Sequence, residues 1–79
     1  MTYSKTYKED NSMKVNIDKI RGLMAENHDT NETLGKKIGV SAATISNYLN
    51  GKTDMTVVLL GRVAQAYNVD AFTLLAQNK

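Results

Sequence analysis

The side chains best suited to specific chemistry lie near the middle of the chain: Ala42, Ala43, Thr44, Ser46 and Asn47. An asparagine amide can pair with adenine through N6 and N7, and an alanine methyl can contact a thymine methyl. Serine and threonine hydroxyls can bond to bases or to phosphates. Small polar residues also face water on any surface helix, so the residue types alone leave both interpretations open.

Two short helices are predicted to position these side chains. Residues 42–49 form one helix, since its apolar residues recur at i, i+3 and i+4: Ile45, Tyr48 and Leu49. Ser41 is a suitable N-cap for it. Before the break, Leu34 and Ile38 share one helix face, and Gly39 can take the left-handed conformation that ends a helix. Helix, tight turn and N-capped helix predict a helix-turn-helix.

The remaining pattern predicts three more helices, at residues 17–26, 57–67 and 71–76. Their N-caps are Asn16, Thr56 and Asp70. The helix that ends at Gly39 begins at Asp29 or Thr30, and Asp29 with Glu32 resembles a capping box. No strand pattern or internal repeat is present, so we expect an all-α domain of five short helices over residues 17–76.

Composition and charge narrow the class of protein. The 79 residues suffice for one small domain, and the lack of cysteine excludes a disulfide framework or a zinc finger. The longest apolar run, Val57 to Leu60, is too short to span a membrane, and we expect a cytoplasmic protein. The net charge is only +2, yet residues 33–53 hold three lysines and no acid. That positive stretch fits phosphate binding or a solvated helix face.

The sequence contains no complete catalytic or metal-binding motif. The chain has one histidine, His28, and no cysteine, so no metal ligand set is expected. Gly51-Lys52-Thr53 resembles the end of a phosphate-binding loop. Such a loop requires its first glycine at position 46, which is a serine here. No Ser/His/Asp set has room to form a catalytic cleft. We expect neither an enzyme nor a cofactor.

The first sixteen residues lack periodicity and are interpreted as a flexible N-terminal tail. Lys5, Lys8 and Lys14 would let this tail act as an arm on the phosphate backbone, and acidic residues beside them oppose this. Met13 is an alternative start of translation. The sequence leaves both questions open.

Residues 30–52 resemble the helix-turn-helix of the lambda-repressor-like family, also called the Cro, phage-repressor or XRE family. Several family motifs occur in order, namely Leu34, then Gly39-Val40-Ser41, then Ile45-Ser46, then Asn50-Gly51-Lys52. The likeness extends from about residue 17 to residue 75. It implies a five-helix domain that binds double-stranded DNA, usually as a homodimer on a partly palindromic operator.

The resemblance also implies roles for individual residues. The positions that match the family's base-reading side chains are Ala42, Ala43, Ser46 and Asn47. Those that match its phosphate contacts are Asn31, Thr44, Asn50 and Lys52.

Three residues depart from the family pattern. Gly35 replaces the usual alanine, Asn31 the usual glutamine, and Asp29 a usual apolar residue. Moreover, residues 42–49 contain no Arg, Lys or Gln, so a bidentate contact to guanine is not available from them. We therefore expect modest specificity, weighted toward A/T-rich positions and DNA shape.

Val58 and Phe72 fall at positions where the family is usually polar, which predicts a homodimer interface or, alternatively, scattered surface residues. The favoured role is a phage- or mobile-element-type repressor that blocks polymerase by covering its operator. No small-molecule effector is expected. An antitoxin, a restriction-modification controller and a protein-interaction adaptor remain alternatives.

Overall fold

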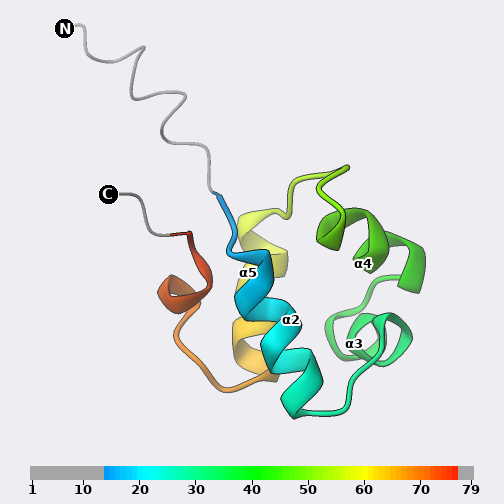
Figure 1. Cartoon of the computed structure of the whole chain (residues 1–79), viewed down its shortest axis with the longest axis horizontal. Coiled ribbons are helices and arrows are strands. Elements are labelled where there is room, and N and C mark those ends of the chain that lie inside the picture. The colour runs from blue at the N-terminus through cyan, green and yellow to red at the C-terminus, as the bar shows by residue number, and fades with distance from the viewer. Residues whose placement is uncertain (1–13, 77–79) are drawn as a thin grey trace, which may run out of the picture.

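The computed structural model describes residues 14–76, which form a bundle of short helices (Figure 1). The predictions for Lys5, Lys8 and Met13 concern residues 1–13, which lie outside the described residues. In chain order the elements are α2 (Ile17–Glu26), α3 (Asn31–Ile38), α4 (Ala42–Leu49), α5 (Val57–Ala66) and the 3₁₀ helix η1 (Ala71–Leu74). No helix in the described part is long and apolar enough to cross a bilayer.

The helices begin where the capping residues predict. Asn16, Ser41 and Thr56 each accept a hydrogen bond from the backbone N–H three residues later. The Asp70 carboxylate accepts from the N–H of Phe72 and starts η1 in the same way. Each such bond satisfies a backbone donor that the first helical turn leaves unpaired.

The predicted capping box of α3 is wrong. Its N-cap is Thr30, whose hydroxyl accepts from the Thr33 N–H at 3.2 Å while the Thr33 hydroxyl accepts from the Thr30 N–H at 2.8 Å. Glu32 instead faces solvent, 4.0 Å from Lys36. Asp29, expected as the cap, is used elsewhere.

The fifth predicted helix is also corrected. It is a 3₁₀ helix of four residues that ends at Leu74, so the described residues contain four α-helices rather than five. Leu75 is extended because the chain pairs here with its own beginning: the Asn16 N–H donates to the Leu74 carbonyl and the Ala76 N–H to that of Lys14. Three residues assigned from the sequence to the tail, 14–16, therefore contact the domain.

One apolar core joins the helices. It contains buried side chains from all four α-helices and from η1, and its most fully buried side chains are Ile20, Leu34, Ile38, Ile45, Val63 and Leu74. The chain reverses direction between helices at left-handed residues, and three of these, Gly39, Asn68 and His28, have φ values of 86°, 57° and 58°. Gly39 was predicted to end its helix in this conformation. Within this core, α3 packs against α4 and against α5.

Candidate nucleic-acid interface

The turn between α3 and α4 is unusually close. A methyl group added at Gly35 would lie 2.5 Å from the carbonyl oxygen of Val40. The Gly35 carbonyl accepts hydrogen bonds from the N–H groups of both Gly39 and Val40, at 2.7 and 2.9 Å. Gly35 is thus required by this approach of two backbone segments, which helix propensity alone does not reveal.

The outer face of α4 carries the predicted base-reading residues. Ala42, Ala43 and Asn47 are exposed, whereas Ser46 is half-buried. The opposite face is held in the core by Ile45, Tyr48 and Leu49. Residues at i, i+1, i+4 and i+5 lie on one side of a helix, so the four candidates form one surface. All four of these side chains are small and uncharged.

The hydroxyl groups of Thr44 and Ser46 are already engaged. Thr44 Oγ1 lies 3.0 Å from Ser41 Oγ, and Asn50 Nδ2 donates to Ser46 Oγ at 3.3 Å. The Asn47 amide makes no side-chain hydrogen bond to another described residue. Asn47 is consequently the base-reading candidate with the most hydrogen-bonding capacity left for a ligand.

The predicted phosphate contacts come from two elements. Asn31 is the first residue of α3, where unpaired N–H groups and the helix dipole favour an anion. Thr44 is half-buried in the first turn of α4. Asn50 caps the end of α4, and Lys52 follows it in an exposed turn. In the sequence, Asn31 precedes the base-reading candidates, Thr44 lies among them, and Asn50 and Lys52 follow them.

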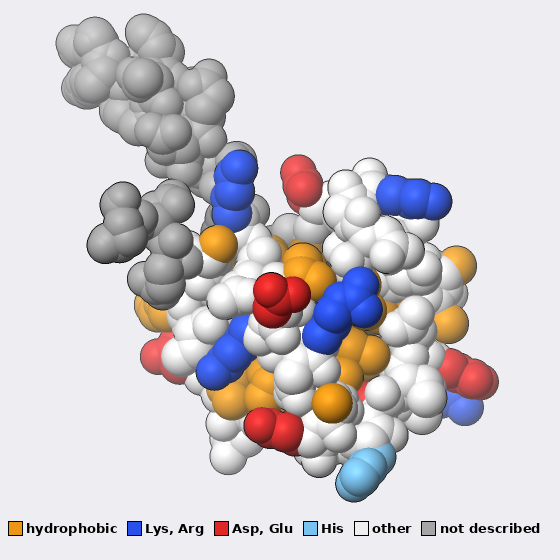
Figure 2. All heavy atoms as spheres, viewed as in Figure 1, with side chains coloured by type: hydrophobic (Ala, Val, Ile, Leu, Met, Phe, Trp, Pro, Cys, Tyr) orange, Lys and Arg blue, Asp and Glu red, His pale blue; other side chains and the backbone are white. Residues whose placement is uncertain are grey.

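Most basic side chains near this surface have partners within the described chain. Arg21 donates to the Leu49 carbonyl and Arg62 to the Ile38 carbonyl, both at 3.1 Å, which stabilises the C-terminal ends of α4 and α3. Lys37 pairs with Asp29, whereas Lys52 has no ion pair within residues 14–76. On the face seen in Figure 2, basic, acidic and apolar side chains alternate without one continuous basic patch.

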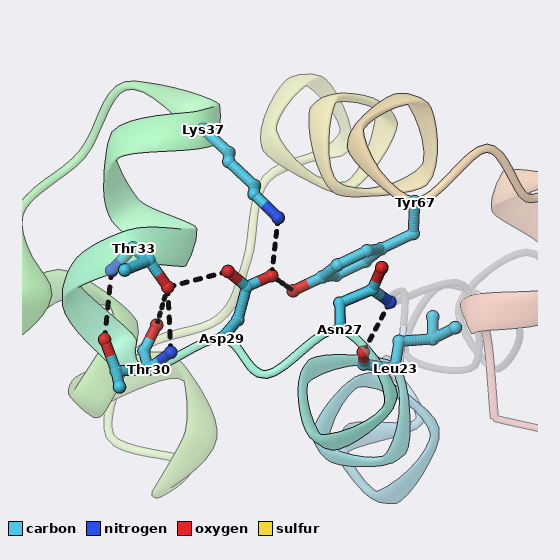
Figure 3. A network of polar contacts seen from close by, with 7 residues as sticks. All are labelled: Leu23, Asn27, Asp29, Thr30, Thr33, Lys37 and Tyr67. Carbon is cyan, nitrogen blue, oxygen red and sulfur yellow. Dashed lines mark hydrogen bonds and ion pairs between the residues drawn. The ribbon is translucent and has the colours of Figure 1, made fainter.

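A polar cluster that the sequence did not predict lies between α3 and the end of α5 (Figure 3). The Asp29 carboxylate accepts hydrogen bonds from Thr33 Oγ1 at 2.7 Å, Lys37 Nζ at 2.8 Å and the Tyr67 hydroxyl at 2.7 Å. Only 4% of the Asp29 side-chain surface is exposed. The one signal in the sequence was an acid at a position where the family is apolar.

These contacts shift two pKa values. Burial by itself would raise the pKa of Asp29, but the hydrogen bonds from Lys37, Thr33 and Tyr67 outweigh it and lower the pKa from 3.8 to about 2. The pKa of Tyr67 is raised by burial and by its hydrogen bond to the carboxylate. Asp29 is therefore charged and Tyr67 neutral at physiological pH.

The residues predicted to form a dimer interface are exposed. Phe72 and Val58 expose 74% and 64% of their surfaces, and Val57, which the sequence did not single out, exposes 66%. Phe72 lies in η1 and the two valines begin α5, and these two elements pack against each other. Exposed apolar side chains of this size fit either a surface that associates or ordinary scattered surface residues.

Comparison with known families agrees with this geometry. A family model described as helix-turn-helix matches residues 20–74, well over half of the chain. The chain belongs to this family of XRE or lambda-repressor-like helix-turn-helix domains. It is accordingly a DNA-binding transcriptional regulator of the XRE type. Comparisons with curated proteins and with solved structures gave no match.

Proposed function

We propose that the protein is a sequence-specific repressor of the phage or mobile-element type, which covers an operator and blocks polymerase. The observation that carries the proposal is the outer face of α4, on which Ala42, Ala43 and Asn47 are exposed while its inner face is buried. A helix presented in this way fits the major groove. No step beyond occupancy is required for this mechanism.

Within the proposed complex, α4 reads bases and the flanking residues hold phosphates. Ala42, Ala43, Ser46 and Asn47 face base edges, and Asn47 pairs with an adenine. Asn31, Thr44, Asn50 and Lys52 meet the backbone and fix the register. Since α4 has no side chain for a bidentate guanine contact, the operator is weighted toward A/T pairs and toward DNA shape.

The repressor acts as a homodimer through the exposed apolar side chains of Val57, Val58 and Phe72. Two copies related by a twofold axis would present two α4 helices to successive major-groove half-sites. The exposure of all three side chains supports this surface.

Selection of bound duplexes from a random DNA pool, followed by a gel-shift salt titration, tests the proposal. We expect a partly palindromic A/T-rich site, with affinity that falls steeply as salt rises because phosphates are neutralised. An invariant guanine opposite α4 would contradict the specificity proposed. No binding at low salt would contradict DNA binding itself and favour a protein-interaction adaptor, which the uncharged outer face of α4 would also suit.

A further inference from the structure

The cluster around Asp29 joins three parts of the chain. Asp29 lies in the loop before α3, Thr33 and Lys37 lie on α3, and Tyr67 follows α5 (Figure 3). A tyrosine and an aspartate that are 38 positions apart in the sequence meet at 2.7 Å. Lys37 Nζ also lies 5.4 Å from the centre of the Tyr67 ring, within the range of a cation–π contact.

The cluster fixes the rotation of α3. Thr33 and Lys37 are four residues apart, so they lie one turn apart on the same face of the helix. Both donate to the Asp29 carboxylate, which Tyr67 ties to the end of α5. If α3 turned about its axis, at least one of these charge-assisted hydrogen bonds would break while its carboxylate acceptor stayed buried.

Asn31 is only two residues from Asp29, at the start of the helix that the cluster holds. Lys37 and Asp29 neutralise each other, so this pair adds little net attraction for DNA. The Lys37–Asp29 pair can therefore affect DNA binding through the position of α3, and with it of Asn31, rather than through its charge. An amide must lie within hydrogen-bonding distance of a phosphate oxygen to contribute, and small displacements remove that contact.

We propose that Tyr67, through Asp29 and Lys37, is a positioning residue that sets α3 so that Asn31 meets the DNA backbone. This inference rests on the proposed function. It assigns a role in DNA affinity to a side chain that lies on no DNA-facing element. An apolar residue at position 29 could bury surface, but it could not hold α3 at a fixed rotation by directional bonds.

A double-mutant cycle between Tyr67→Phe and Asn31→Ala tests the proposal. The probe is a fluorescent duplex recovered from the selection above, and the temperature is one at which circular dichroism shows every variant folded. We expect each single change to weaken binding by about threefold to tenfold, and the double variant to bind no more weakly than Asn31→Ala alone. If Tyr67 only stabilised the fold, Tyr67→Phe would leave the DNA affinity of the folded protein unchanged. If Tyr67 and Asn31 acted independently, the free-energy effects of the two substitutions on binding would add.

Tyr48→Phe is the matched control, since its hydroxyl makes no hydrogen bond to another described residue. A second comparison uses lysines. Lys37→Met and Lys36→Met remove the same charge from neighbouring positions on α3, yet only Lys37 belongs to the cluster; Lys36 is exposed, 4.0 Å from Glu32. We expect Lys37→Met to weaken binding at least threefold more than Lys36→Met.

The outcomes separate the two proposals. If the wild type binds no duplex, the proposed function fails and this inference fails with it. If the wild type binds but Tyr67→Phe binds equally well, or its effect is undiminished when Asn31 is already alanine, only the positioning role is overturned. Equal effects of the two lysine changes would overturn it as well.

Discussion

At the scale of single residues, helix propensity and steric fit have opposite effects at Gly35: propensity favours alanine, whereas the space available there favours glycine. Alanine in place of a glycine within a helix is worth about 1 kcal/mol of propensity. In this helix the new methyl would lie 2.5 Å from the Val40 carbonyl oxygen, which belongs to backbone rather than to a flexible side chain. Gly35→Ala should therefore destabilise the domain by about 1–3 kcal/mol, as overpacking does, in urea unfolding.

Gly22→Ala and Gly61→Ala are the matched controls, because a methyl at either helical position meets no atom within 4 Å. These changes should stabilise the domain by up to about 1 kcal/mol. If all three substitutions stabilised it alike, the close turn between α3 and α4 would be refuted.

Asp29 predicts how stability depends on acid. Its pKa is lower in the folded state than in the unfolded chain, so its contribution is complete above about pH 4 and is lost as the pH falls through about 2. The contribution is at most about 2 kcal/mol. Unfolding free energies of the wild type and of Asp29→Asn should differ most near neutral pH and converge near pH 2. A gap independent of pH would contradict the lowered pKa.

Residue types along the sequence predict local interactions, but they do not predict the contact between Asp29 and Tyr67. Capping by Ser41, Thr56 and Asp70 depends on atoms within three residues, so it follows from residue types. The meeting of Asp29 with Tyr67 depends on how α5 packs against α3, which no local pattern encodes. The same is true of Gly35, since its neighbour is the carbonyl across the turn.

At the scale of elements, α4 is the part whose function is most open to test. Asn47→Ala should weaken binding to the selected duplex by about 1–3 kcal/mol and relax its preference at one base pair. Gln65→Ala removes an amide from an exposed position on α5 and should change neither. Repeating the random-pool selection with Asn47→Ala measures both effects. An unchanged site preference would remove Asn47 from base reading.

The elements themselves were predicted unequally well. The four α-helices follow from apolar spacing and caps, and their bounds agree within about a residue. The last helix was predicted too long because the backbone of Leu74 and Ala76 bonds to residues near the start of the chain. Helical periodicity does not predict these hydrogen bonds, because their partners, Lys14 and Asn16, lie far away in the sequence.

At the scale of the whole molecule, the exposed side chains of Val57, Val58 and Phe72 predict self-association. Phe72→Asp places a charge where 74% of the phenylalanine is exposed, so it should leave the fold intact and abolish the dimer. Sedimentation measures the mass and circular dichroism the fold. Ala25→Asp, which adds an acid at an exposed position on α2, should sediment like the wild type. A mass unchanged by Phe72→Asp would exclude Phe72 from the interface.

The pairing of residues 14–16 with residues 74–76 means that the described chain nearly closes into a ring. The Ala76 nitrogen lies 2.8 Å from the Lys14 oxygen. In Figure 1 this junction lies on the side away from α3. A circular permutant could thus join the two ends with a linker of a few residues and open the chain at another exposed loop. Such a permutant would change the order of the helices along the chain and keep the packing that exposes the outer face of α4.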